Sequence, residues 1–296
     1  MASDGPRRVW RTESSSTLRV RLSSGVEVGG GGFVVIAGPC AVESAAQIEA
    51  AAEAVAAHGA HALRGGAFKP RTSPYSFLGL GEAGLEVLAV SARRHRLPVV
   101  TEVMDAAQLP VLLEYADVLQ IGARNMQNYS LLKAVSKVNR PVLLKRGLSA
   151  TLEEWLLAAE YVLEGGNDQV ILCERGIRTF EPQLRNTLDL AAVAWVKERT
   201  RLPVLVDPSH ATGDRALVIP MSLAAAAAGA DGLLVEVHPR PAEALCDGAQ
   251  ALTPAMFGQL MGSLKKVLAA VDRSMAMPTV ARRHVLPLPL FARSAP

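Results

Sequence analysis

Short runs of apolar residues alternate with longer segments of helical periodicity along most of this chain. Eight apolar runs, each of a length typical of strands, lie at residues 33–37, 60–63, 98–101, 117–121, 141–145, 169–173, 203–206 and 231–236. Segments in which apolar residues recur every three or four positions follow them at residues 45–58, 82–95, 105–115, 126–138, 151–164, 184–199, 216–229 and 254–271. Continuous apolar runs are typical of strands that are buried on both faces. Strict alternation in eight units of on the order of 30 residues therefore predicts an α/β fold, a closed (β/α)8 TIM barrel.

The two ends of the chain differ from this pattern. Apolar Leu18, Val20 and Leu22 alternate with arginines, and a Ser-Ser-Gly turn leads into Val26, which predicts a short β-hairpin. Past the last helical segment, Pro and Leu alternate near the end of the chain; docking on a partner is one interpretation of this segment, and a frayed tail is the one we favour. We therefore expect an N-terminal extension with a hairpin at 1–32, a catalytic barrel at 33–272 and a C-terminal tail at 273–296.

Composition excludes several classes of function. The net charge is 31 − 28 = +3 and aromatic residues make up only 4% of the chain, which argues against a nucleic-acid surface. No Gly-x-Gly-x-x-Gly follows a predicted strand, which weakens both a dinucleotide site and the alternative of a doubly wound open sheet. No apolar stretch suits a signal peptide or a membrane span, and three cysteines without a Cys-x-x-Cys pair suit a reducing compartment. We therefore expect a cytoplasmic protein.

The loop after the second predicted strand, residues 64–75, has an unusual composition. It carries the cations Arg64, Lys69 and Arg71 together with two glycines, two prolines and three hydroxyl groups. Glycine allows backbone amides to approach a ligand, proline stiffens the loop, and arginine matches phosphate oxygens two at a time. A solvated surface loop is the plainer alternative, but the loop favours a site for a small phosphorylated anion.

Ligands of such barrels bind at the carboxyl ends of the strands, and polar side chains follow all eight predicted strands. Four cations from different strands, Arg64, Arg124, Lys145 and Arg175, should meet above the barrel centre. Because like charges repel, this clustering is costly unless a polyanion sits between them. The rest of the rim holds Glu102 after the third strand and the Asp-Pro-Ser-His segment after the seventh.

Four further side chains at this rim have the chemistry of metal ligands. They are a thiol, an imidazole and two carboxylates, at Cys40, His210, Glu236 and Asp247. This donor set suits a divalent transition ion, whether Mn, Fe, Co or Zn. Wide spacing in sequence makes the signal weak, and a small buried residue in a Gly-Pro turn is the alternative for Cys40. His238 points elsewhere than Glu236, and Cys246 is interpreted as a bystander.

Several long strings at the predicted strand ends resemble those of one known family. They are Ala37-Gly-Pro-Cys40, Arg64-Gly-Gly-Ala-Phe-Lys-Pro-Arg-Thr-Ser73, Gln120-Ile-Gly-Ala-Arg-Asn-Met-Gln-Asn128, Leu144-Lys-Arg-Gly147, Cys173-Glu-Arg-Gly-Ile-Arg-Thr-Phe180 and Asp207-Pro-Ser-His-Ala211. Together they resemble type I 3-deoxy-D-arabino-heptulosonate 7-phosphate (DAHP) synthase, of the branch shared with KDO-8-phosphate synthase. The resemblance covers about residues 33–265, in order and without large gaps.

The resemblance implies condensation of phosphoenolpyruvate with erythrose 4-phosphate and water, the first step of the shikimate pathway of aromatic amino acid biosynthesis. It implies a divalent metal on Cys40, His210, Glu236 and Asp247, and catalytic roles for Lys69, Cys40, His210 and Glu102. It also implies that substrate is bound by Arg64, Lys69, Pro70, Arg71, Thr72, Glu102, Ala123, Arg124, Lys145, Arg175 and Asp207, with Arg71 and Thr72 on the aldose phosphate.

The partners expected on this basis are a homo-oligomer, dimer or tetramer, and chorismate mutase. Many relatives carry a regulatory domain before the barrel, whereas about 32 residues precede the first strand here. We therefore expect no response of the isolated chain to phenylalanine, tyrosine or tryptophan.

Three other functions stay open. In KDO-8-phosphate synthases the corresponding sequence is similar to Lys-Ala-Asn-Arg-Ser, whereas this chain has Lys69-Pro-Arg-Thr-Ser73. This difference argues against KDO-8-phosphate synthase activity. A related synthase of specialised metabolism, acting on a modified tetrose, fits the same motifs. A non-catalytic binding barrel would be expected to have lost part of the ligand and cation set, which is complete here.

Overall fold

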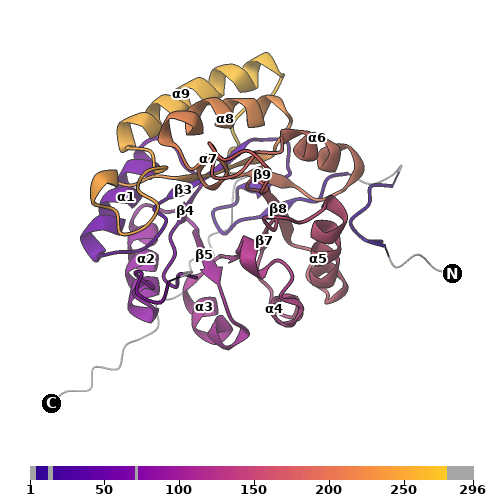
Figure 1. Cartoon of the computed structure of the whole chain (residues 1–296), viewed down its shortest axis with the longest axis horizontal. Coiled ribbons are helices and arrows are strands. Elements are labelled where there is room, and N and C mark those ends of the chain that lie inside the picture. Colours follow the sequence, from indigo (N-terminus) through magenta and orange to yellow (C-terminus); the bar gives the residue numbers. More distant parts are fainter. Residues whose placement is uncertain (1–4, 13–15, 71–72, 279–296) are drawn as a thin grey trace.

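The computed structural model describes residues 5–12, 16–70 and 73–278, and its centre is a closed barrel of parallel strands (Figure 1). The strands follow one another around the barrel in chain order, and β10 closes it against β3. They are β3 (Val34–Gly38), β4 (Ala62–Arg64), β5 (Val99–Val103), β6 (Val118–Ile121), β7 (Val142–Lys145), β8 (Val170–Glu174), β9 (Val204–Val206) and β10 (Gly232–Glu236). This topology confirms the predicted (β/α)8 barrel. Every strand of the barrel is buried on both faces, as the apolar runs indicated.

Helices surround the barrel and lie between successive strands. They are α1 (Ala45–Ala57), α2 (Glu82–Arg94), α3 (Leu109–Tyr115), α4 (Tyr129–Val135), α5 (Leu152–Glu164), α6 (Leu190–Arg199), α7 (Pro208–Thr212), α8 (Arg215–Ala227) and α9 (Pro254–Ala270), with short 3-10 turns at Ala106–Gln108, Ala123–Asn125 and Pro241–Glu243. The described helices are too short or too polar to cross a membrane.

The helices differ from the predicted ones at several places. The helix expected from residue 184 begins at Leu190, because Asp189 accepts a hydrogen bond from the Ala192 amide and caps the helix there. The helix expected from residue 126 begins at Tyr129, after a 3-10 turn. The five-residue helix α7 was not predicted, since it is too short to show a periodic pattern.

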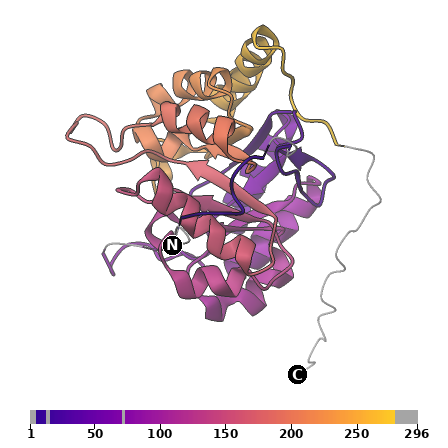
Figure 2. The same ribbon diagram turned by 90° about the vertical axis from the view of Figure 1, so that its right-hand side faces the viewer.

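The predicted hairpin closes one end of the barrel. Strands β1 (Val20–Arg21) and β2 (Glu27–Val28) pair antiparallel, and Val20 and Val28 pack with the inward-facing strand residue Ile36. A second, larger core lies between the strands and the helices. Figure 2 shows the hairpin, in indigo, on the side of the barrel opposite the loops that follow the strands. These loops are therefore left to form a site, while the residues expected as a tail beyond 278 lie outside the described residues.

Candidate functional site

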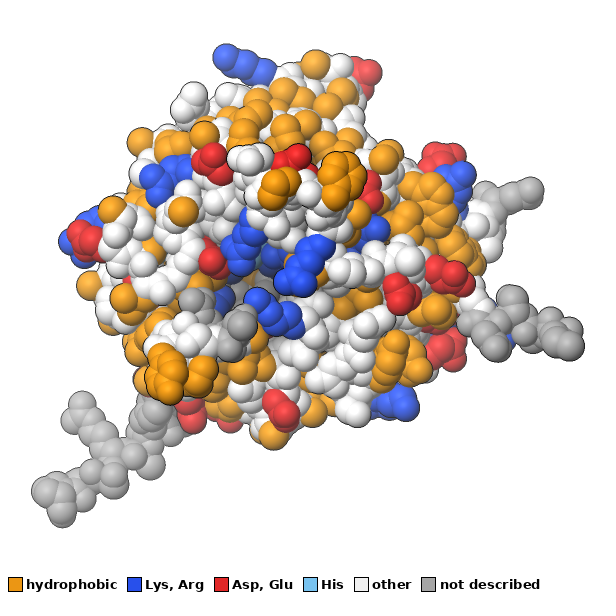
Figure 3. Space-filling model, viewed as in Figure 1, with side chains coloured by type: hydrophobic (Ala, Val, Ile, Leu, Met, Phe, Trp, Pro, Cys, Tyr) orange, Lys and Arg blue, Asp and Glu red, His pale blue; other side chains and the backbone are white. Residues whose placement is uncertain are grey.

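A pocket of about 380 Å³ opens among the loops at the carboxyl ends of the strands. Figure 3 shows lysine and arginine side chains gathered in this central hollow. Its lining includes most of the predicted site residues, namely Arg64, Lys69, Pro70, Glu102, Ala123, Arg124, Lys145, Arg175, His210 and Asp247. Arg71 and Thr72 lie outside the described residues. The rim expected from barrel geometry is thus a real cavity, and its walls are strongly cationic.

Four of the cations are nearly buried: Arg64, Lys69, Lys145 and Arg175 are each at most 8% exposed. Arg64 is paired with Glu236 at 3.0 Å and Lys145 with Asp207 at 2.6 Å. Arg175 differs, because its NH1 atom is buried and has no hydrogen-bond partner among the described residues. Burial lowers the pKa of Arg175, although the nearby Asp207 favours the charged form. An unpaired buried donor of this kind is expected where an anion binds.

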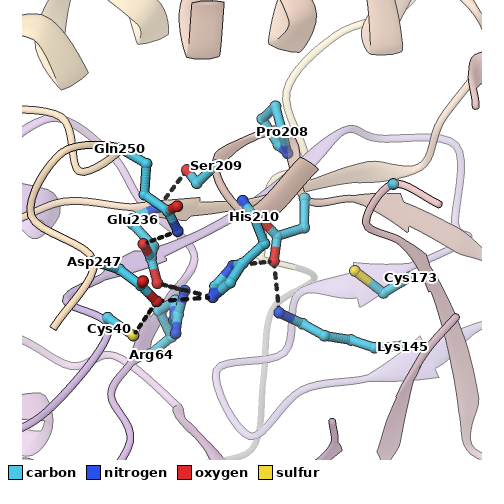
Figure 4. Close-up of polar contacts among 12 residues, drawn as sticks. Cys40, Arg64, Lys145, Cys173, Pro208, Ser209, His210, Glu236, Asp247 and Gln250 are labelled. Carbon is cyan, nitrogen blue, oxygen red and sulfur yellow. Dashed lines mark hydrogen bonds and ion pairs between the residues drawn. The ribbon is translucent and has the colours of Figure 1, made fainter. Parts of the chain in front are cut away.

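The four predicted metal ligands lie together beside this pocket, although they are far apart in sequence. Their donor atoms all lie within 4.8 Å of one another. The Cys40 thiol donates to Asp247 Oδ2 at 3.2 Å, and His210 Nε2 lies 3.2 Å from Glu236 Oε1 (Figure 4). One thiol, one imidazole and two carboxylates in a largely buried cluster form a donor set that fits a divalent transition ion.

Each of the four ligand candidates comes from a different element of the rim. Cys40 follows β3, His210 lies on α7, Glu236 ends β10 and Asp247 lies in the following loop. Asp247 has a φ of 53°, in the left-handed region that is unfavourable for residues other than glycine. Such a backbone conformation persists only where surrounding contacts hold it.

His210 has one ring nitrogen bonded to Asp207 and the other directed at the cluster. Its Nδ1 lies 2.7 Å from Asp207 Oδ2, so Nδ1 carries the proton and the Nε2 lone pair faces Glu236. Burial lowers the pKa of His210, although Asp207 and Glu236 favour the charged form. The pKa of the Cys40 thiol is raised, first by its hydrogen bond with Cys246 and then by burial, so the thiol keeps its proton and donates a hydrogen bond to Asp247.

Lys69 lies between the cluster and the pocket. Its Nζ atom donates to Cys40 Sγ at 3.0 Å and to the Cys40 carbonyl at 3.1 Å. Glu102 lies on β5, the strand next to β4, and Gln120 donates to its Oε2 atom at 3.3 Å. A side chain at Gly122 would collide with Glu102 Oε1, so only glycine leaves room for this carboxylate.

Asp207, predicted to bind substrate, is in contact with protein groups on both oxygens. Oδ1 accepts from the His210 amide at 2.9 Å, and Oδ2 accepts from Lys145 and from His210 Nδ1. Asp207 is fully buried and is not part of the pocket lining. In this structure it orients the side chains of Lys145 and His210.

Sequence reasoning did not identify several residues of the site. Arg178, Arg185 and Asn186 line the pocket from the loop at 175–189, which was expected to be partly helical. Gln250 lies behind Glu236, where its Nε2 donates to Glu236 Oε2 at 2.6 Å. Only the Arg-Gly-Ile-Arg string, as part of the family resemblance, pointed to this loop.

Neighbouring residues of a strand point to opposite faces. The side chains of Lys145 and Arg146 therefore point apart, and so do those of Glu174 and Arg175. Lys145 and Arg175 face the pocket, whereas Arg146 and Glu174 form an ion pair at 3.0 Å. Arg146 also pairs with Asp189 at 2.9 Å, so it ties together the two ends of the loop at 175–189.

The remaining cysteines and His238 have other roles. Cys173 is fully buried inside the barrel, as its place in an apolar strand indicated. His238 pairs with Glu43 at 3.2 Å and is not part of the four-residue cluster. Cys246 Sγ lies 3.2 Å from Cys40 Sγ, so it contacts a ligand candidate without being part of the set.

Comparison with known proteins identifies close relatives. Residues 17–272 match the model of the DAHP synthetase I family. A Thermotoga maritima phospho-2-dehydro-3-deoxyheptonate aldolase is 53% identical over 246 residues, which are 83% of this chain and 73% of that protein. A 2-dehydro-3-deoxyphosphooctonate aldolase of Syntrophotalea carbinolica is 33% identical over 253 residues, covering 79% of this chain and 89% of its own.

Two solved structures have the same fold. A crystal structure of the Thermotoga maritima DAHP synthase superposes with a TM-score of 0.89 at 49% identity, covering 93% of this chain and 80% of that chain. A truncated form of the Thermotoga maritima enzyme gives a TM-score of 0.84 at 46% identity, with 90% of this chain and 98% of that chain covered.

Proposed function

Because the chain belongs to the DAHP synthetase I family, we propose that its DAHP synthase activity takes place in the cationic pocket at the carboxyl ends of the strands. The reaction condenses phosphoenolpyruvate with erythrose 4-phosphate and water, and yields DAHP and phosphate. The phosphooctonate aldolases are more distant relatives, so their activity is not favoured. The catalytic unit proposed here is residues 33–272.

The observation that supports this site most strongly is the group of buried cations. We assign phosphoenolpyruvate, with its carboxylate and phosphate, to Arg64, Lys69, Arg124, Lys145 and Arg175, all of which line the pocket. The buried and unpaired NH1 atom of Arg175 supports an anion at this place. Charge-assisted bonds to an anion are each worth about 1.5–3 kcal/mol.

We assign one divalent ion, Mn, Fe, Co or Zn, to Cys40, His210, Glu236 and Asp247. When bound, such an ion would act as a Lewis acid that polarises the aldehyde of the sugar. The protein's own part is to hold the Nδ1 side of His210 on Asp207, which leaves Nε2 for the ion, and to place the thiol, the imidazole and two carboxylate oxygens within reach of one another.

The side chains of the pocket supply the remaining chemistry. As the enol carbon of phosphoenolpyruvate attacks the aldehyde, negative charge develops on the aldehyde oxygen. The Lys69 ammonium, beside Cys40, can stabilise this charge and donate a proton to it. Glu102 places the water that adds at the phosphate-bearing carbon. The bond between that carbon and the phosphate oxygen then breaks, and phosphate leaves.

Pro70, which lines the pocket, leads into Arg71 and Thr72, which we assign to the aldose phosphate. Pro70 restrains the backbone directly after Lys69, and Arg71 and Thr72 follow within three residues, a spacing that favours a four-carbon aldose over a five-carbon one. The homo-oligomer, chorismate mutase as a partner and the cytoplasmic location stay predictions.

The test is a phosphate-release assay on the purified protein with phosphoenolpyruvate and either erythrose 4-phosphate or arabinose 5-phosphate. We expect kcat/KM to be higher for erythrose 4-phosphate by at least about tenfold, or about 1.4 kcal/mol. EDTA should abolish turnover, and Mn²⁺ or Co²⁺ should restore it. Equal use of the two sugars would reject the aldose assignment, and full activity of metal-stripped protein would reject the metal.

A further inference from the structure

Each carboxylate of the proposed metal set turns one oxygen toward the cluster and the other away from it. Glu236 Oε1 lies 3.2 Å from His210 Nε2, and Asp247 Oδ2 accepts from the Cys40 thiol at 3.2 Å. The second oxygens, Glu236 Oε2 and Asp247 Oδ1, are held by two residues outside the set. Both of these residues were missed by sequence reasoning.

Gln250 holds the outer oxygen of Glu236. Its Nε2 donates to Glu236 Oε2 at 2.6 Å (Figure 4), and its Oε1 accepts from Arg185 NH1 at 2.7 Å. A flipped amide would set its oxygen against the carboxylate and its NH₂ against the guanidinium, so both neighbours fix the same orientation. Gln250 is only 2% exposed, which leaves little solvent to replace these bonds.

Arg185 holds the outer oxygen of Asp247. The NH1 atom that contacts Gln250 also donates to Asp247 Oδ1 at 3.2 Å. The backbone of Arg185 is tied to the end of α7, since its amide donates to the Thr212 carbonyl at 3.2 Å. Arg185 thus connects the loop that carries Asp247 with the short helix that carries His210.

We propose that Gln250 and Arg185 are positioning residues that sort the carboxylate oxygens of the metal site. Gln250 keeps Glu236 Oε2 away from the cluster, and Arg185 does the same for Asp247 Oδ1, so that each carboxylate offers one oxygen. This inference rests on the proposed metal site and deepens it. Outer residues that orient ligands change metal affinity by about 10–100-fold when they are removed.

The decisive variant is Gln250→Met, which keeps the volume and the neutral charge of the side chain but removes both hydrogen bonds. The full chain is stripped with EDTA, dialysed and titrated with Co²⁺ or Mn²⁺ in competition with a chromophoric chelator. We expect the metal Kd to rise about tenfold or more. The matched control is Gln169→Met, at a half-buried glutamine whose side chain donates to Asn139, and its Kd should stay within about twofold of wild type.

Arg185→Gln provides a second test, in which the sign of the effect is informative. Loss of a cation near a divalent ion removes repulsion and by itself would tighten binding, whereas loss of positioning weakens it. We expect weaker metal binding in Arg185→Gln. In the double variant with Gln250→Met, the metal Kd should rise by less than the product of the two single increases, because both substitutions remove the same Arg185–Gln250 hydrogen bond. The Arg185 side chain is 38% exposed, so this variant should fold even if Gln250→Met does not.

The outcomes separate this inference from the proposed function. Unchanged metal Kd in folded Gln250→Met, or tighter binding in Arg185→Gln, would overturn the positioning role while the metal site stands. Absence of metal binding by the wild-type chain would overturn the site itself and this inference with it. Weaker metal binding, with the unfolding temperature of the metal-free protein within a few degrees of wild type, supports the inference.

Discussion

Replacement of Arg146 by Met should destabilise the protein strongly, although Arg146 does not line the pocket. In the wild type, its NH1 atom pairs with Glu174 at 3.0 Å and with Asp189 at 2.9 Å, and its Nε donates to the Ala150 carbonyl at 3.1 Å. Glu174 is fully buried and Arg146 is 5% exposed. Arg146→Met keeps the aliphatic stem but leaves a buried carboxylate without its cation.

The expected loss follows from this burial. Breaking a buried ion pair from one side costs about 3–5 kcal/mol, because the remaining charge is uncompensated. Glu174 keeps one hydrogen bond, from the Gly176 amide at 2.6 Å, so we expect the lower end, about 3 kcal/mol. The measurement is urea unfolding at pH 8, followed by tryptophan fluorescence, with Trp155 packed near Arg146 as a reporter.

Two controls test the reasoning. If the cost is that of a stranded charge, Arg146→Met/Glu174→Gln should be more stable than Arg146→Met alone. Arg19→Met breaks an exposed pair with Glu27 and should cost no more than about 1 kcal/mol. A loss below about 1 kcal/mol for Arg146→Met, or a double variant no more stable than the single one, would refute the argument.

The pH dependence of Arg146→Met has a definite sign. Burial raises the pKa of Glu174 above that of the unfolded chain even with Arg146 present, and removal of the guanidinium should raise it further. Protonation then removes the buried charge, so the deficit should shrink as the pH falls from 8 toward 5 and reappear as the pH rises through the folded-state pKa.

Three further predictions follow from other parts of the chain. Cys40→Ser should weaken metal binding while leaving the circular dichroism spectrum intact, since it replaces one ligand atom; an unchanged metal Kd would count against the thiol as a ligand. Arg71→Ala should raise KM for the aldose phosphate far more than for phosphoenolpyruvate in the steady-state assay, and an effect confined to phosphoenolpyruvate would reject the assignment. The ring of His61 accepts a hydrogen bond from the Val35 amide and bonds the Ala276 carbonyl, and burial lowers its pKa. Because the unfolded chain then binds this proton more readily, the free energy of unfolding should fall by at most about 1.4 kcal/mol per pH unit below about pH 6.5. His61→Gln should flatten that slope in urea titrations at pH 7 and 5, and an equal slope would show that other groups cause it.

The barrel could be predicted because each of its parts leaves a local signal. A strand such as Val170–Glu174 is buried on both faces and therefore reads as a continuous apolar run. Barrel geometry then places the residue after each strand at one rim, which is why Lys145 and Arg175 were assigned to a single pocket. The resemblance supplied the individual roles, which periodicity alone does not contain.

What could not be predicted depends on contacts between distant segments. Arg185 and Gln250 matter because of bonds across 65 positions of the chain, and neither has a local pattern that shows this. The start of α6 depends on the Asp189 cap, whereas apolar spacing alone extended the helix to residue 184. His210 was found by its motif, but the short helix that carries it was not.

The pairing of charges in the pocket explains how so many cations can lie together before a substrate arrives. Arg64 and Lys145 would repel each other in an apolar setting, but each is held by a buried carboxylate, Glu236 and Asp207. These carboxylates either belong to the proposed metal set or orient it, so the metal site and the anion site stabilise one another's charges. The cations are therefore fixed in place in advance, and little reorganisation is needed when the substrate binds. Arg175, whose NH1 atom has no partner in the described chain, is the cation with the most to gain from an anion, so it should contribute the most to phosphoenolpyruvate affinity among these buried cations.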